Sequence, residues 1–331
     1  MNNASIGNVI QRIDGWLTGA PVFCSGSGAV AGITRGEEIV YWYGEIAGYY
    51  LSYLAGLTAQ SSKQEKFAVS AAIRVGTWLQ DQWRGEPALT RIYACETADW
   101  RNDRIFAFDL AMILQGLAVV QRFDAGIWNG RQIAECIKTR LIDERGGLRA
   151  VSEDARGKPP DTWSTRMDGH QLKAAASLIA WGRQFEDPAL LALGERTVRL
   201  LGKDGVSDWP HLPLHPRLYA QEGALHCGLA TASAMAVTLN NIFVSTDVAT
   251  VRTDSAAQLL RLALIARIEG PCVDALLSRL LTSVDADGSV TIHPDPITGE
   301  RNTWCAIFVR QALFFYLEAR LGRKLRVEMC I

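Results

Sequence analysis

Two kinds of helical segment alternate along this chain, and the alternation constrains the fold more than any other feature. Apolar residues recur at three- and four-residue steps, the spacing of one face of an α-helix. One kind of segment is rich in Ala and Gly with few charges, as in 107–117 (AFDLAMILQGL), and is typical of a helix buried on nearly all sides. The next segment, 131–144 (RQIAECIKTRLIDE), is amphipathic and charged. The alternation predicts inner helices, each followed by a half-exposed outer helix.

These pairs recur through the whole sequence. We expect the inner helices to start near Glu45, Phe108, Gly169, Tyr219, Asp254 and Trp304. The last of them, 304–320, has no partner after it, and the amphipathic segment 5–17 has no inner helix before it. Pairing these two ends closes a circle. The sequence therefore predicts an all-α (α/α)6 toroid, a single domain over residues 1–331, in which the N-terminal helix packs on the last inner helix. Strand signals are weak, and only 288–292 (GSVTI) is expected to form a short strand or hairpin arm.

Composition and net charge limit the classes of binding partner and the cellular location expected for this chain. Hydrophobic residues make up 48% and charged residues 21%, and 34 basic residues nearly balance 35 acidic ones. A net charge of −1 gives no electrostatic reason to expect nucleic acid or an anionic membrane as the principal partner. No apolar run reaches the roughly 18 residues of a membrane-spanning helix, and the N-terminus lacks a signal-peptide pattern. Seven scattered cysteines are typical of reduced thiols, so we expect a cytoplasmic protein.

Polar and aromatic residues gather at the starts of the predicted inner helices. If these helices run the same way around the ring, their N-terminal ends meet at one mouth. Burying polar groups there without partners would cost several kcal/mol, so their repetition indicates a site. The candidate residues are Tyr43, Glu45, Tyr49, Arg104, Asp109, Trp163, Asp168, His170, His215, Arg217, Tyr219, Asp254, Gln258, Arg261, Asn302 and Trp304.

Carboxylates interleaved with aromatic and basic side chains are what a sugar site requires. Aromatic faces can stack on sugar rings, and two carboxylates on either side of a bond can act as acid and base or as acid and nucleophile. Glu45 is the first candidate for proton transfer, because the aromatic residues around it in the sequence would shield it from water. Asp109 and Asp254 are candidates for the second carboxylate. His170 and His215 are alternative acid or base groups.

Other interpretations of these residues stay open. Asp168 and Asp254 stand at helix starts, where an aspartate often only caps the helix or balances its dipole. Glu45 could form a structural ion pair with Arg104 or Arg252. The ring could equally be a non-catalytic glycan-binding or scaffold protein, or act on a prenyl or peptide substrate.

Absent motifs limit the cofactors. The sequence has no phosphate-binding loop and no dinucleotide-binding glycine motif, so no nucleotide cofactor is expected. His226-Cys227 invites comparison with the zinc-bearing lanthipeptide cyclases, which are also toroids. Their Cys-His pair has the opposite order, so we expect no metal and no other cofactor.

Four segments carry a resemblance to a known family. They are 43–54 (YGEIAGYYLSYL), 106–117 (FAFDLAMILQGL), 252–263 (RTDSAAQLLRLA) and 302–313 (NTWCAIFVRQAL). They resemble blocks of a bacterial toroid family found among polysaccharide-biosynthesis proteins, which is similar to six-hairpin glycosidases and to the helical domain of glucuronyl C5-epimerases. The resemblance implies a hydrolase-like or uronate epimerase-like protein of polysaccharide biosynthesis or modification, with a glycan substrate and possible polysaccharide-assembly partners. By the same resemblance, the site would include Tyr43, Glu45, Tyr49, Asp109, Asp254, Gln258 and Trp304.

Overall fold

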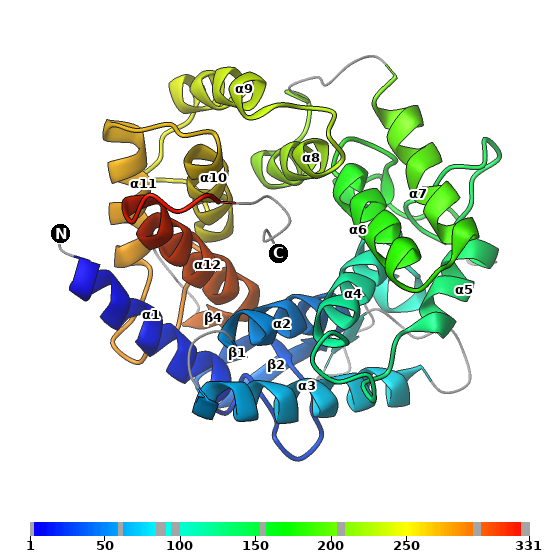
Figure 1. Cartoon of the computed structure of the whole chain (residues 1–331), viewed down its shortest axis with the longest axis horizontal. Coiled ribbons are helices and arrows are strands. Elements are labelled where there is room, and N and C mark those ends of the chain that lie inside the picture. Colours follow the sequence, from blue (N-terminus) through cyan, green and yellow to red (C-terminus); the bar gives the residue numbers. More distant parts are fainter. Residues whose placement is uncertain are drawn as a thin grey trace.

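A closed ring of helices forms the body of the molecule (Figure 1). The computed structural model describes residues 3–58, 62–83, 91–93, 100–152, 157–203, 209–293 and 299–325. Each inner helix contacts the next one along the chain, and α12 contacts α2, so the ring closes as predicted. The inner helices are α2 (Gly44–Leu57), α4 (Ala107–Val120), α6 (Gln171–Gln184), α8 (Leu214–His226), α10 (Thr253–Ile265) and α12 (Thr303–Arg320).

The outer helices surround this ring. They are α1 (Asn3–Thr18), α3 (Ser62–Gln82), α5 (Arg131–Arg140), α7 (Pro188–Leu201), α9 (Ala232–Ser245) and α11 (Pro271–Thr282). The predicted pairing of the chain's two ends is confirmed, because α1 packs against α12. Across this seam, Nε of Arg310 lies 3.0 Å from Oδ1 of Asp14 in a buried ion pair. Within the described part of the chain, no helix is both long and apolar enough to cross a membrane.

Glycines let the inner helices approach closely. A Cβ added to Gly48 of α2 would lie 2.4 Å from the carbonyl oxygen of Met112 on α4. A Cβ on Gly223 of α8 would lie 2.4 Å from the backbone nitrogen of Lys173 on α6. Real side chains do not fit at such distances, so these helices pack backbone against backbone and bring their neighbouring side chains together.

The fourth inner helix begins earlier than expected. We predicted its start near Tyr219, whereas α8 starts at Leu214 and includes His215 and Arg217. Pro216 explains the difference, because a proline is tolerated in the first turn of a helix, where its missing N–H has no partner to lose. The residues expected to precede this helix therefore lie on it.

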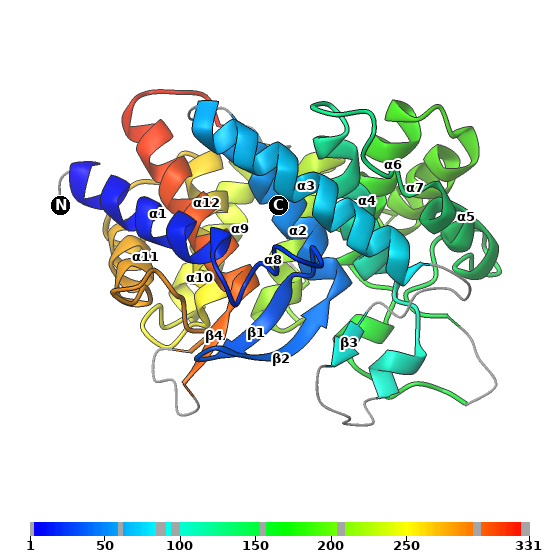
Figure 2. The same cartoon turned by 90° about the horizontal axis from the view of Figure 1, so that it is seen from below.

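A four-stranded sheet is the main feature that the sequence analysis missed. Its antiparallel strands lie in the order β3 (Arg91–Tyr93), β2 (Glu38–Tyr43), β1 (Ala31–Arg35) and β4 (Glu300–Asn302). β2 leads directly into α2 and β4 directly into α12, so the sheet lies where these inner helices begin (Figure 2). The segment 288–292, expected as a short strand or hairpin arm, forms no regular strand but pairs with 283–285 across a turn. A tight turn with Gly288 at φ +90° leaves only an isolated bridge between Val284 and Val290.

Candidate functional site

A cavity of about 550 Å³ lies at the end of the ring where the inner helices begin. Its lining comes from the first turns of several inner helices, from β2, and from two short 3-10 helices, η1 (Trp100–Asp103) and η2 (Trp163–Thr165). This volume falls within the roughly 300–1,000 Å³ range of small-molecule sites. The predicted residues that line it are Tyr43, Glu45, Asp109, Trp163, His215, Tyr219 and Trp304.

Two carboxylates reach the cavity from neighbouring helices. Glu45 lies in the first turn of α2 and Asp109 in the first turn of α4, and they are 9% and 6% exposed. The positive end of each helix dipole favours a negative charge at these positions. The hydroxyl of Tyr43 donates to Oδ2 of Asp109 over 3.0 Å.

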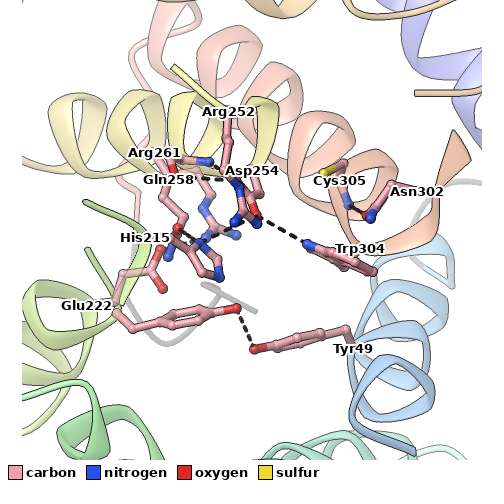
Figure 3. Close-up of polar contacts among 12 residues, drawn as sticks. Tyr49, His215, Glu222, Arg252, Asp254, Gln258, Arg261, Asn302, Trp304 and Cys305 are labelled. Atoms are coloured by element: carbon pink, nitrogen blue, oxygen red, sulfur yellow. Dashed lines mark hydrogen bonds and ion pairs between the residues drawn. The ribbon is translucent and has the colours of Figure 1, made fainter. Parts of the chain in front are cut away.

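Asp254, the other predicted carboxylate, is fully buried and lies beside the cavity-lining residues His215, Arg252 and Trp304 (Figure 3). Its Oδ2 is 2.5 Å from Nη2 of Arg252, accepts from Nε1 of Trp304 over 3.2 Å, and lies 3.6 Å from Nδ1 of His215. Burial raises the pKa of Asp254, but the charge of Arg252 and the hydrogen bonds from Arg252 and Trp304 outweigh burial, so the pKa ends below its usual value. Asp254 thus stays ionised and holds three cavity-lining side chains.

His215 is oriented by two acceptors on α10. Its Nδ1 lies 2.7 Å from Oε1 of Gln258 and 3.6 Å from Asp254. Both acceptors favour a proton on Nδ1, which leaves the lone pair on Nε2. Burial lowers the pKa of His215, and the nearby charge of Asp254 only partly opposes it. The imidazole is therefore neutral near pH 7 and can accept a proton.

His170 does not share this position. It is fully buried and packs against two cavity-lining rings, Trp163 at 5.2 Å and Phe108 at 6.1 Å between ring centres. Burial lowers the pKa of His170 to about 4. His170 therefore supports the wall of the cavity as a neutral packed ring.

Several other predicted residues have partners away from the cavity. Asp168 lies 2.7 Å from Nε2 of His211 and borders a separate cavity of about 230 Å³. Arg104 donates from Nη2 to the carbonyl oxygen of Gly157 over 2.6 Å. Arg217 is half-buried on α8. These three predicted residues are not among the described residues of the cavity lining.

The remaining predicted residues lie beneath or beside the cavity. Asn302 caps α12 by accepting the backbone N–H of Cys305 over 2.9 Å. Tyr49 donates its hydroxyl proton to the hydroxyl of Tyr219 over 2.9 Å. Arg261, predicted to bind substrate, is 0% exposed and forms ion pairs inside the ring. The described cavity lining does not include Asn302, Tyr49, Gln258 or Arg261.

Other lining residues were not selected from the sequence. Tyr41 reaches the cavity from β2, and Trp100 and Arg101 reach it from η1. A search for α-helical spacing does not detect a strand or a single 3-10 turn. The alternating segment 38–43 (EIVYWY) is the signal that could have found β2. Arg252 was considered as a structural partner of Glu45 and was not selected as a site residue; it lines the cavity and pairs with Asp254. Among the described residues, no group of three or more His, Cys, Asp and Glu side chains could hold a metal ion.

Several solved structures share this fold over nearly the whole chain. Cellobiose 2-epimerase from Bacillus thermoamylovorans matches with a TM-score of 0.66 and 12% identity, over 96% of this chain and 100% of that one. An unsaturated glucuronyl hydrolase specific for heparin matches with a TM-score of 0.66 and 10% identity, over 98% of this chain and 99% of that one. A D-mannose isomerase matches with a TM-score of 0.66 and 10% identity, over 96% of this chain and 98% of that one. The predicted six-hairpin glycosidase-like toroid is confirmed. No protein-family model and no curated protein sequence matches the chain.

Proposed function

We propose that this protein is an enzyme that performs acid–base chemistry on a sugar bound in the cavity at the mouth of the ring. One observation carries the proposal: Glu45, Asp109 and the neutral His215 line the same cavity, among aromatic rings. The names of the three similar structures, an epimerase, a hydrolase and an isomerase of sugars, support the same class of substrate.

The cavity walls suit a sugar ring. Trp100, Trp163 and Trp304 offer indole faces for the apolar side of a pyranose. Arg252 uses Nε and Nη2 to hold Asp254, which fixes the plane of its guanidinium group at the cavity edge. A guanidinium fixed in this way can donate its other N–H groups to sugar oxygens.

The proton-transfer groups have different environments, and these suggest their roles. Asp109 accepts a hydrogen bond from Tyr43, and we assign it the role of base or nucleophile. We assign the role of proton donor to Glu45, the other carboxylate of the cavity lining. His215 offers Nε2 as a second base, because its Nδ1 is engaged by Gln258. Both hydrolysis and proton transfer at carbon need such a pair of acid and base.

A substrate panel in D₂O tests the proposal. Incubation with D-mannose, D-glucose and cellobiose would reveal epimerisation or isomerisation through deuterium incorporation, and 4-nitrophenyl glycosides and glucuronides would reveal hydrolysis. Glu45→Gln, Asp109→Asn and His215→Asn should each lower kcat by about 10²- to 10⁴-fold. Glu195→Gln, an exposed change on α7, is the matched control and should stay within about threefold of wild type.

The outcomes separate the rival functions. A wild-type protein that binds these sugars and converts none of them would be a glycan-binding or scaffold protein. Wild-type turnover that survives all three substitutions would contradict the assigned site. Binding of none of the sugars would contradict the proposed substrate class.

We also propose that the substrate belongs to bacterial polysaccharide biosynthesis or modification in the cytoplasm, and that the protein associates with polysaccharide-assembly proteins. This rests on the resemblance of 43–54 and 302–313 to that toroid family, and on the scattered, odd-numbered cysteines. Cross-linking in a polysaccharide-producing bacterium, followed by identification of the linked proteins, tests the association.

A further inference from the structure

A group of charged side chains lies inside the ring, one helical turn below the cavity along α8. Nζ of Lys173 on α6 is 2.6 Å from Oε2 of Glu222, and Nη2 of Arg261 on α10 is 2.5 Å from Oε1 of the same carboxylate. Arg261 also donates to Oε1 of Gln311 on α12. The charged side chains are at most 5% exposed. We call Lys173, Glu222 and Arg261 the buried charge network.

Stability alone does not account for this network. Removing ionised groups from water costs several kcal/mol each, and well-packed apolar side chains in their place are often as stable or more stable. Two cations, Lys173 and Arg261, hold the carboxylate of Glu222 from two different helices. Gly223 permits the close approach of α6 and α8 that brings Lys173 to Glu222. The inner ring thus holds charged side chains in a place shielded from water.

Tyr219 connects the network to the cavity. It lines the cavity, and Nζ of Lys173 lies 4.6 Å from the centre of its ring. Burial raises the pKa of Tyr219 well above 10, so the phenol stays neutral. The hydrogen bond from Tyr49 uses the proton of Tyr49, which leaves the hydroxyl proton of Tyr219 to donate to another acceptor. A cation against the ring face strengthens the phenol as a donor, because it favours negative charge on the oxygen.

The ring of Tyr219 is held from several sides. Phe108 of α4 lies 4.9 Å away between ring centres, and Phe308 of α12 lies 6.4 Å away. His215, one turn earlier on α8, lies at 4.5 Å. Residues four apart on a helix share a face, so the proton acceptor and the phenol face the cavity from successive turns.

We propose that Tyr219 is a catalytic hydrogen-bond donor to a sugar oxygen that becomes negatively charged, and that Lys173, Glu222 and Arg261 are positioning residues for it. A proton passes from a substrate hydroxyl, or from a C–H next to a carbonyl, to Nε2 of His215. The electron pair of the broken bond comes to rest on the sugar oxygen, which accepts the hydrogen bond from Tyr219. The step reverses when the proton returns. This inference rests on the proposed function.

Tyr219→Phe, assayed with the sugar that wild type converts fastest in the panel, tests the donor. The ring and its packing remain, so the melting temperature should change little. A donor that acts only on developing charge should lower kcat by about 10²- to 10³-fold, with KM within about threefold. Tyr50→Phe is the matched control, because Tyr50 is also a buried tyrosine and donates to the carbonyl oxygen of Leu17, away from the cavity. It should retain wild-type kcat.

Lys173→Met tests the network. It leaves Glu222 paired with Arg261 and keeps the aliphatic volume, so the protein should fold. It should lower kcat about tenfold, and Lys173→Arg should recover part of the loss because it restores the charge. If Tyr219→Phe lost activity while Lys173→Met kept it, the positioning role would be wrong. If wild type converted a sugar and Tyr219→Phe did so equally well, the donor role would fall and the proposed function would stand. If wild type neither bound nor converted any sugar, both would fall.

Discussion

Two buried arginines of the inner ring make a useful comparison. Arg261 and Arg310 each lie over an aromatic ring and each pair with a carboxylate from a neighbouring helix. At the seam between α1 and α12, the positive charge of Arg310 is balanced by the negative charge of Asp14. Under the cavity, Arg261 shares Glu222 with Lys173, so one carboxylate holds two basic side chains.

This difference indicates a separate role for each of the two ion-pair arrangements. A neutral pair is enough to join two helices, and the seam needs nothing more. The network under the cavity also contacts the site, because the ammonium group of Lys173 lies against the ring of a cavity-lining tyrosine, Tyr219. We therefore assign the seam to ring closure and the network to the site.

Removal of the shared carboxylate should have the largest effect. Glu222→Gln leaves Lys173 and Arg261 as buried like charges, so the free energy of unfolding at pH 7 should fall by about 3–5 kcal/mol. Burial raises the pKa of Glu222, but Arg261 and Lys173 outweigh it and the pKa ends below its usual value. A carboxyl group of this kind stabilises the fold above its unfolded pKa and loses that effect as pH falls through the lowered pKa.

Urea unfolding measured from neutral to acid pH checks this prediction. Wild type and Glu222→Gln should differ most near pH 7 and converge at acid pH. The exposed control Glu195→Gln should change stability by less than about 0.5 kcal/mol. A loss below about 1 kcal/mol for Glu222→Gln would mean that the network is not a coupled ionic group.

Changes at the seam should have a smaller effect and should spare activity. Arg310→Met leaves the largely buried Asp14 without its ion pair, and we expect a loss of about 2–3 kcal/mol in unfolding free energy. The double variant Asp14→Leu/Arg310→Met replaces the pair by apolar contact and should regain most of that stability. Its kcat should equal that of wild type, in contrast to Lys173→Met. A tenfold loss of kcat in the stable double variant would erase the distinction between seam and network.

The sequence predicted the ring because that prediction depended on helical spacing and on the two unpaired ends, 5–17 and 304–320. It did not predict the sheet, because β3 and β4 are short and form only when distant segments meet. The same limit applied to the cavity, where Tyr41 comes from a strand and Trp100 from a short 3-10 helix.

Within the helices, the sequence located charged residues but not their partners. Position at a helix start singled out Asp109 and Asp254 equally, yet Asp109 lines the cavity and Asp254 is buried beside its lining residues. Arg261 was chosen for its charge, although it points to Glu222 inside the ring. Lys173 was not chosen, because a single lysine on an Ala-rich helix shows its role only when α8 is placed against α6.

A third pair, Arg252 with Asp254, shares features with both the seam and the buried charge network. Substitutions in this pair should have the smallest effect of those considered. Its charges cancel as at the seam, but both residues act on His215 at the cavity wall. Burial lowers the pKa of His215, Asp254 raises it and Arg252 lowers it. If neutral His215 is the base, kcat/KM should fall as pH drops through this lowered pKa.

The two single variants should then move the acid limb of the pH profile in opposite directions. Asp254→Asn removes the charge that raises the pKa of His215, so the limb should move to lower pH. Arg252→Gln removes the charge that lowers it, so the limb should move to higher pH. Each shift should be about half a unit to one unit, equivalent to about 0.7–1.4 kcal/mol. Profiles of kcat/KM from pH 4 to 8 measure both. Shifts in the same direction would show that the pair acts on folding, as the seam does, and not on the base.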